Sequence, residues 1–132
     1  MTQKTNRFLI VDDDPINNFL TKTVLKKSFE AVHVNDFTVP EEGLEFIKSG
    51  ANHNANGEKT ILFLDINMPT LTGWQFLEAF KLFDESIRAQ YTIYILSSSI
   101  NHSDIKLAKE HQLILDFIEK PLNKIKLANI LS

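Results

Sequence analysis

The sequence predicts an α/β domain in which a five-stranded parallel sheet is covered by helices on both faces. Two observations support this fold class. Short apolar blocks without polar alternation recur along the chain, and such runs are typical of strands that are buried on both sides. Stretches with helix start signals separate these blocks, so strand and helix alternate five times. This alternation favours parallel strands joined by right-handed crossovers.

Three apolar tetrads are the strongest strand candidates, at residues 8–11, 61–64 and 93–96. They are rich in branched and aromatic side chains, which strands prefer. Two weaker candidates lie at residues 32–34 and 117–118. Together they give the five expected strands.

Helix signals follow each candidate strand. Asp14-Pro15 combines an N-cap acid with a proline at the first helical position, and Ile16, Leu20 and Val24 then recur at every fourth residue. We therefore expect a first helix whose apolar stripe contains these three residues. Further helices are expected after Pro40, after Gly73, from a cap at Ser103-Asp104 and from about Asn123.

Composition limits the classes of protein to consider. The 132 residues suit one domain, which we assign to residues 1–132, and 43% hydrophobic with 23% charged residues is typical of a folded protein. No apolar run exceeds four residues, which argues against a transmembrane helix. The absence of cysteine excludes disulfides and thiolate metal sites. A net charge of −3 argues against direct binding to nucleic acid or to an anionic membrane. We expect a cytoplasmic protein.

Two segments lack packing signals. Residues 1–6 are expected to form a flexible tail. Residues 50–59 are rich in asparagine and glycine, and we expect them to form a mobile loop before the third strand. This loop lies at the amino-terminal edge of the predicted sheet, whereas ligands of such sheets bind beyond the carboxyl ends of the strands. We therefore expect no chemical role for it.

Polar side chains follow the predicted strands where each strand ends. Asp12 and Asp13 follow the first strand, Asp65 the third, Ser97 the fourth and Lys120 the fifth. The carboxyl ends of parallel strands meet at one edge, so these side chains should converge there. Carboxylate oxygens are the ligands that Mg²⁺ prefers in proteins. A magnesium ion and the lysine would together balance the charge of the three acids.

Such a constellation suits the acceptance of a phosphoryl group. It offers a carboxylate nucleophile, a metal site and an ammonium group that can hold a phosphoryl oxygen. Each feature alone also has a structural explanation, because acids cap helices, and Lys120-Pro121 and Gly73 are ordinary turn residues. The prediction depends on all of them falling at the correct strand ends in order.

Four motifs carry a resemblance to a known family. They are Phe-Leu-Ile-Val-Asp-Asp-Asp-Pro at 8–15, Leu-Asp-Ile-Asn-Met-Pro-Thr-Leu-Thr-Gly at 64–73, Ile-Leu-Ser-Ser at 95–98 and Phe-Ile-Glu-Lys-Pro-Leu at 117–122. In this order they resemble the response-regulator receiver domain of two-component signalling, as in single-domain chemotaxis regulators. The resemblance implies a flavodoxin-like, doubly wound (βα)5 sheet with strand order 2-1-3-4-5.

The resemblance also implies roles for the acidic residues. Asp65 would be the phosphoacceptor, receiving its phosphoryl group from a phosphohistidine on a histidine kinase or a histidine phosphotransfer protein. Asp13, Asp65 and the backbone carbonyl of Asn67 would ligate magnesium directly, and Asp12 would act mainly through a bound water.

Further roles follow from the same resemblance. Lys120 would pair with the acceptor carboxylate and then with a phosphoryl oxygen, and Ser97 would donate its hydroxyl to the phosphoryl group. Phe117 occupies the position of the family's switch aromatic, and Pro121 would follow a cis peptide bond. Gly73 would be a structural residue at the site. Phosphorylation would change the surface at residues 104–131, where an unidentified downstream protein target would bind.

Two alternatives remain open from the sequence. One is a pseudo-receiver that serves only as a protein-interaction scaffold. The other is an aspartate-nucleophile phosphatase, which needs a second acid two residues after the nucleophile, where this chain has Asn67. For the receiver, we expect no enzyme activity beyond the domain's own phosphorylation and dephosphorylation. If these 132 residues are the complete chain, we expect its output to be protein binding or a phosphorelay step.

Overall fold

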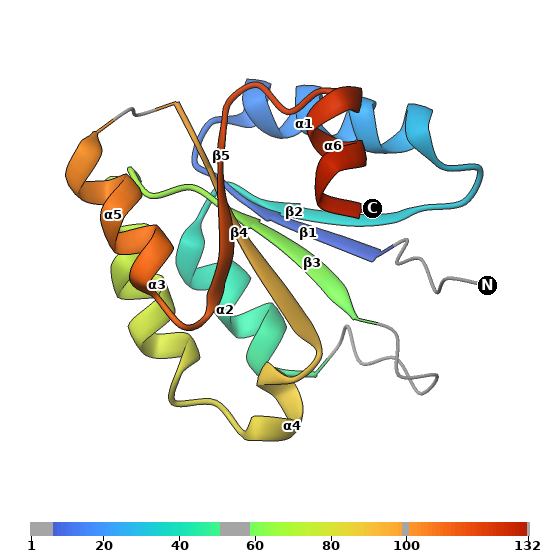
Figure 1. The fold of residues 1–132 in the computed structure, drawn as a ribbon. Helices are drawn as coiled ribbons and strands as arrows, with labels where there is room; N and C mark the ends of the chain where they lie inside the picture. The colour runs from blue at the N-terminus through green and yellow to red at the C-terminus, as the bar shows by residue number, and fades with distance from the viewer. Residues whose placement is uncertain (1–6, 51–58, 99–100, 132) are drawn as a thin grey trace.

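Five parallel strands form the centre of the protein in the computed structural model, which describes residues 7–50, 59–98 and 101–131 (Figure 1). The strand order is β2-β1-β3-β4-β5, which confirms the doubly wound fold with strand order 2-1-3-4-5. The expected tail at 1–6 and residues 51–58 of the expected loop lie outside the described residues. The strands are β1 Arg7–Val11, β2 His33–Phe37, β3 Thr60–Leu64, β4 Tyr91–Ser97 and β5 Ile114–Glu119.

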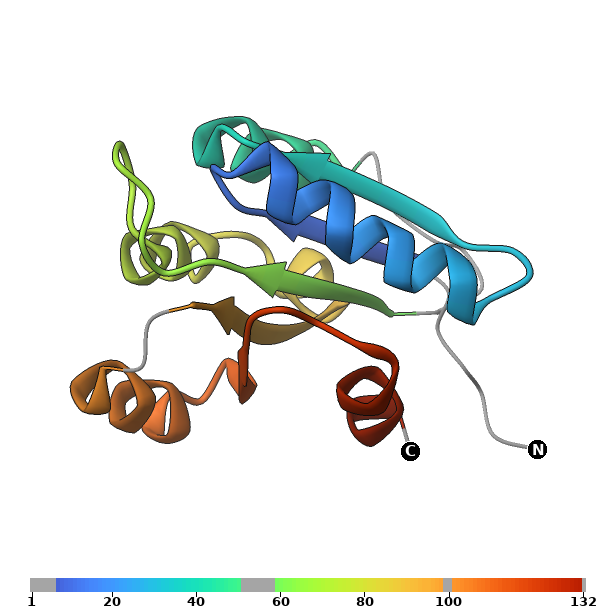
Figure 2. The same cartoon turned by 90° about the horizontal axis from the view of Figure 1, so that it is seen from above.

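Helices cover both faces of the sheet. In Figure 1, α1 and α6 lie above the sheet, and α2, α3 and α5 lie on its other side; Figure 2 is seen from the side of α1 and α6. Within the described ranges, no helix combines the length and the apolar composition that crossing a bilayer requires. The helices are α1 Pro15–Ser28, α2 Pro40–Lys48, α3 Gly73–Phe80, α4 Glu85–Arg88, α5 His102–Glu110 and α6 Lys124–Leu131.

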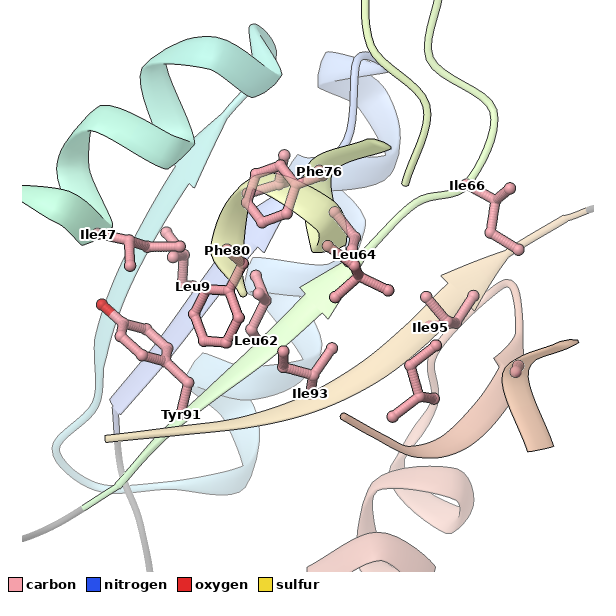
Figure 3. Packing of buried hydrophobic residues seen from close by; sticks show 14 of the residues in the cluster. Leu9, Ile47, Leu62, Leu64, Ile66, Phe76, Phe80, Tyr91, Ile93 and Ile95 are labelled. Carbon is pink, nitrogen blue, oxygen red and sulfur yellow. The ribbon is translucent and has the colours of Figure 1, made fainter. Parts of the chain in front are cut away.

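The apolar core has two parts because side chains of each strand point alternately to the two faces. Leu9, Leu62 and Ile93 are aligned in neighbouring strands and face α3, where Phe76 and Phe80 pack against them (Figure 3). On the opposite face, Phe8, Ile10 and Phe63 belong to a second cluster with Leu25 of α1 and Leu127 of α6. The predicted continuous apolar tetrads are therefore strands that are buried on both sides.

The two weakest strand predictions were too short. β2 begins at His33 and continues to Phe37, and β5 covers Ile114–Glu119 rather than 117–118. Both strands lie at the edges of the sheet, and half-buried or exposed positions interrupt their apolar pattern. The predicted start of α5 was also misplaced, because Asn101 is its N-cap and accepts a hydrogen bond of 2.8 Å from the backbone N–H of Ser103.

Most of the apolar stripe predicted for α1 does not face the core: of its three residues, only Val24 packs against the second cluster. Ile16 and Leu20 are 69% and 48% exposed, and Phe19 beside them is 65% exposed. The buried residues of this helix are instead Asn17, Asn18, Thr21 and Leu25. The periodicity therefore gave the correct helix, but the rotation of the helix about its axis was wrong.

Candidate functional site

The sheet places Asp12 and Asp65 side by side. The parallel ladder pairs Val11 with Leu64, the last residues of β1 and β3, and each aspartate follows its strand directly. Each aspartate adds one hydrogen bond to the end of the ladder. The N–H of Asp65 donates to the carbonyl of Val11 at 2.9 Å. The N–H of Asp12 donates to the carbonyl of Phe37 at 3.1 Å. Their carboxylates therefore start from fixed backbone positions at the carboxyl edge of the sheet.

Three acids meet at this edge, as the sequence predicts. One carboxylate oxygen from each of Asp12, Asp13 and Asp65 lies within 4.8 Å of the others. Asp12 and Asp65 are only 2% and 5% exposed, whereas Asp13 is half-buried. Three like charges in so small a volume repel one another unless a cation is close. The donor set consists of hard carboxylate oxygens, so these residues fit Mg²⁺.

Lys120 supplies a positive charge to the cluster. Its Nζ lies 2.6 Å from Asp12 Oδ2 and 3.7 Å from Asp65 Oδ1, and its side chain is 14% exposed. The backbone N–H of Lys120 donates to the carbonyl of Ser97 at 3.0 Å, which joins the ends of β4 and β5. The resemblance implies a pair between Lys120 and the acceptor, but its nearer partner in the structure is Asp12.

Two asparagines support Asp12, and the sequence did not predict them. Asn17 Nδ2 donates to Asp12 Oδ2 at 2.7 Å, and Asn18 Nδ2 donates to the backbone carbonyl of Asp12 at 3.0 Å. The backbone N–H of Asp14 donates to Asp12 Oδ1 at 2.9 Å. The sequence feature that could have indicated these contacts is the pair of asparagines in the predicted helix directly after the acidic residues. These contacts fix the orientation of the Asp12 carboxylate.

Asp65 is electrostatically different from an ordinary aspartate. Burial, and then the charge of Asp12, raise the pKa of the Asp65 carboxyl group from its ordinary value of 3.8 to about 6. Asp13 also raises this pKa, whereas Lys120 and a hydrogen bond from the backbone of Asn67 lower it. A cation among the acids would favour the charged form of Asp65. The site therefore holds a carboxylate that a metal ion would make available for reaction.

Gly73 allows α3 to begin directly against the backbone of Asp65 and Ile66. Its N–H donates to the carbonyl of Ile66 at 2.8 Å. A Cβ at position 73 would lie 2.6 Å from the backbone oxygen of Asp65 and 2.9 Å from the Cα of Ile66. Neither backbone atom can move away without displacing the loop. Thr72 and Gln75 close a capping box at this helix start, so the loop after Asp65 is fixed at both ends.

The remaining predicted residues also lie near this edge. Ser97 ends β4 and is fully buried, and the peptide bond between Lys120 and Pro121 is cis. Phe117 pairs with Ile95 across β4 and β5 and is a half-buried side chain packed against the core. The proposed phosphoryl contact of Ser97, the switching role of Phe117 and the metal ligation by the Asn67 carbonyl stay predictions.

Comparisons with known proteins agree with this geometry. A family model described as response regulator receiver domain matches residues 8–132. Among solved structures, the chain is similar to a response regulator receiver protein from Dyadobacter fermentans DSM 18053, with 28% identity, 95% of this chain and 94% of that chain covered, and a TM-score of 0.83. It is also similar to a two component response regulator from Cytophaga hutchinsonii, with 26% identity, 97% and 95% coverage, and a TM-score of 0.84. No curated protein sequence matches the chain.

Proposed function

The chain belongs to the response regulator receiver domain family, and from this premise we propose that it accepts a phosphoryl group on Asp65. The donor is a phosphohistidine of a histidine kinase or of a histidine phosphotransfer protein. The observation that carries the proposal is the grouping of Asp12, Asp13 and Asp65 within 4.8 Å, with the ammonium of Lys120 beside them. A nucleophile, a cation site and a fixed ammonium are the parts that phosphoryl transfer requires.

Each side chain has a defined task in this reaction. A carboxylate oxygen of Asp65 forms the new P–O bond while the P–N bond to the donor imidazole breaks, and the released imidazole takes up a proton. Asp12, Asp13 and Asp65, with the carbonyl of Asn67, would hold Mg²⁺, which when bound neutralises charge on the phosphoryl oxygens. Lys120 holds a phosphoryl oxygen, and Ser97 donates its hydroxyl once the group is present.

The alternatives fit the site less well. A scaffold that only binds proteins does not require a buried acid cluster with a lysine, and such a cluster is unfavourable without a cation. A phosphatase of the aspartate-nucleophile type needs an acid two residues after Asp65, and Asn67 lacks the carboxyl group. We therefore propose that the only chemistry of this protein is its own phosphorylation and dephosphorylation.

An exposed apolar surface beside the site supports a protein as the donor. Ile16, Phe19 and Leu20 occupy the first two turns of α1, which begins directly after the acidic residues. Ile125 at the start of α6 is 74% exposed, and α6 lies on the same face of the sheet (Figure 1). Exposed apolar groups that cluster near a reactive site are typical of docking surfaces. We assign this α1 surface to the phosphodonor protein.

Output would use a different part of the molecule. We propose that phosphorylation changes the surface formed by α5, β5 and α6 and that an unidentified downstream protein binds there. Phosphohistidine donors are formed from ATP, which supports a cytoplasmic location for the proposed exchange.

Labelling by a small phosphodonor tests the proposed acceptor. With acetyl phosphate and magnesium, the intact mass at mild pH should increase by one phosphoryl group, and removal of magnesium by a chelator should abolish the increase. Asp65→Asn should show no added mass. An unchanged mass in the wild-type protein, or labelling of Asp65→Asn, would contradict the assignment of Asp65.

The same assay tests the donor surface on α1. Phe19→Ser should slow transfer from a phosphorylated kinase or phosphotransfer protein by roughly tenfold, because docking loses one buried aromatic side chain. Labelling by acetyl phosphate should be unchanged, since a small donor needs no docking surface. Equal slowing with both donors would show that Phe19 supports the acid site rather than docking.

A further inference from the structure

A lysine stands at an electrostatically unfavourable place at the start of α6. The first turn of this helix contains Lys124 and Lys126 and no acidic residue. The N-terminus of a helix carries partial positive charge, so cations are disfavoured there. A contact that offsets the unfavourable charge of a lysine at this helix end therefore points to a role for its side chain.

The ammonium of Lys126 turns back to the end of β5. Its Nζ donates to the carbonyl of Glu119 at 2.7 Å and to the carbonyl of Pro121 at 3.2 Å. Glu119 and Pro121 are the two residues that flank Lys120 in the sequence. The backbone N–H of Lys126 donates to Asn123 Oδ1 at 2.8 Å, which fixes the turn of the helix that carries the lysine. Among the described residues, no carboxylate forms an ion pair with Lys126.

The segment that carries Lys120 is thus held from two sides. On one side, the N–H of Lys120 donates to the carbonyl of Ser97 in β4 at 3.0 Å. On the other side, Lys126 binds the flanking carbonyls from α6. The fixed backbone aims the Lys120 side chain into the acid cluster, where its Nζ lies 2.6 Å from Asp12.

We propose that Lys126 is a positioning residue that orders Lys120 for contact with the acids and the incoming phosphoryl group. This inference rests on the proposed phosphoryl transfer to Asp65. Lys126 does not touch the acid cluster in any described contact and acts through the backbone on both sides of Lys120. Its charge strengthens the two hydrogen bonds, because a charged donor binds a carbonyl more strongly than a neutral one.

The test compares two lysine variants of the full chain. Lys126→Met removes the ammonium and keeps most of the apolar stem. Lys124→Met is the matched control, because Lys124 is an exposed lysine in the same helical turn with no hydrogen bond or ion pair recorded within the described ranges. Both changes remove one positive charge, so their difference isolates the contact with the carbonyls.

Two readouts are measured on each protein. The first is the order parameter of the Lys120 side chain from ¹³C relaxation of its Cε, which needs no phosphorylation. It should fall towards the value of exposed lysines in Lys126→Met and stay at the wild-type value in Lys124→Met. The second is the rate constant for labelling by saturating acetyl phosphate. It should fall by about fivefold in Lys126→Met only, which is less than the loss of a direct hydrogen bond from a charged group would cause, because Lys126 acts through Lys120. The magnesium concentration for the half-maximal rate should change less than this rate constant.

The outcomes separate this inference from the proposed function. A wild-type order parameter for Lys120 in Lys126→Met, or an equal fall in both variants, would overturn the positioning role. A lower melting temperature with an unchanged Lys120 order parameter and an unchanged rate would also overturn it, because Lys126 would then be only structural. If the wild-type protein took up no phosphoryl group, the proposed function would fail, while the relaxation data would still decide whether Lys126 orders Lys120.

Discussion

Asp12 and Asp65 have the same side chain, but their surroundings give them different tasks. The carboxylate of Asp12 accepts hydrogen bonds from Asn17 and from the N–H of Asp14, and it lies 2.6 Å from the Nζ of Lys120. Asp65 lies 3.7 Å from that Nζ, and burial and Asp12 raise its pKa to about 6. Asp12 is therefore held in place by its hydrogen bonds, whereas burial and the charge of Asp12 favour the protonated form of Asp65.

The raised pKa of Asp65 predicts an unusual pH dependence of stability in metal-free protein. Between its unfolded pKa of 3.8 and its folded pKa of about 6, the folded state binds more protons at this residue than the unfolded state does. By linkage, Asp65 therefore destabilises the fold above about pH 6, and this effect disappears as the pH falls towards 4. Asp65→Asn should raise the melting temperature near pH 7, and its advantage should shrink as the pH is lowered.

Melts of both proteins across this pH range, with a chelator present, measure the difference. The comparison cancels His111, whose pKa is lowered by burial and then by Lys81, so its protonation destabilises the fold at low pH in both proteins. An advantage of Asp65→Asn that did not vary with pH would contradict the raised pKa.

At the scale of elements, the strand ends were predictable from the sequence, whereas the buried face of α1 was not. Parallel strands end at the same edge of the sheet, so residues that directly follow buried strands must lie at that edge. This rule identified Asp12, Asp13, Asp65 and Lys120. The rotation of α1 depends instead on hydrogen bonds from Asn17 and Asn18 to Asp12, and these form only after folding.

Two other features were beyond the sequence patterns. The short helix α4, Glu85–Arg88, has only four residues, which is too few to show a helical period. The contact of Lys126 with two carbonyls depends on how the loop after β5 turns back, and no residue pattern encodes that path. Contacts between side chains and backbone carbonyls depend on tertiary geometry rather than on residue order.

The helices α3 and α5 are linked by the single tryptophan of the chain. Trp74 Nε1 donates to Asp104 Oδ1 at 3.2 Å, and the indole ring stacks on His111 with ring centroids 6.3 Å apart. Asp104 lies in α5, and His111 is the first residue after this helix. A displacement of α5 must therefore change the surroundings of Trp74.

We expect tryptophan emission to report the proposed switch. In the proposed mechanism, a phosphoryl group on Asp65 would gain hydrogen bonds from Ser97 and Lys120, each worth about 1.5–3 kcal/mol, which is enough to shift the population of α5 positions by about tenfold or more. The phosphate mimic beryllofluoride with magnesium should therefore change Trp74 emission in the wild-type protein. Ser97→Ala should still accept phosphate on Asp65, but its emission should stay constant.

Asp65→Asn is the control for this measurement, because it should show neither labelling nor a change in emission. If Ser97→Ala gave the wild-type change in emission, Ser97 would not transmit the signal. If the wild-type protein gave no change although it was labelled, α5 would not move as proposed.

At the scale of the whole molecule, apolar packing on both faces of the sheet compensates for a repulsive edge. The two core clusters bury the central strands, while Asp12, Asp13 and Asp65 bring like charges together at the strand ends. A protein of this kind gains stability from any cation that binds the folded state and not the unfolded chain. The fold class itself was predictable because buried parallel strands leave a simple apolar pattern.

Magnesium should therefore stabilise the folded protein. At a hundredfold excess over its dissociation constant, a ligand contributes about 2.7 kcal/mol, which raises the melting temperature by several degrees. Asp13→Asn should raise the melting temperature without metal, because one repelling charge is lost, and should remove most of the magnesium response.

Asp14→Asn is the matched control for the magnesium melts. Asp14 is exposed and caps α1, with its Oδ1 accepting the N–H of Ile16 at 2.9 Å, and asparagine caps helices equally well. This variant should keep the full magnesium response. An equal response in Asp13→Asn and the wild-type protein would exclude Asp13 as a ligand.

The position of Lys120 after the last strand has a consequence for the biosynthesis of the protein. The ribosome adds Asp12, Asp13 and Asp65 well before it adds the lysine that partly balances their charge. A nascent chain that ends within β4 carries every carboxylate of the cluster but has neither the ammonium nor the neighbouring strand that supports it. With Asp65 as the proposed phosphoacceptor, competence to accept a phosphoryl group would therefore arise only when translation has passed β5, and incomplete chains would not compete with finished molecules for phosphoryl groups.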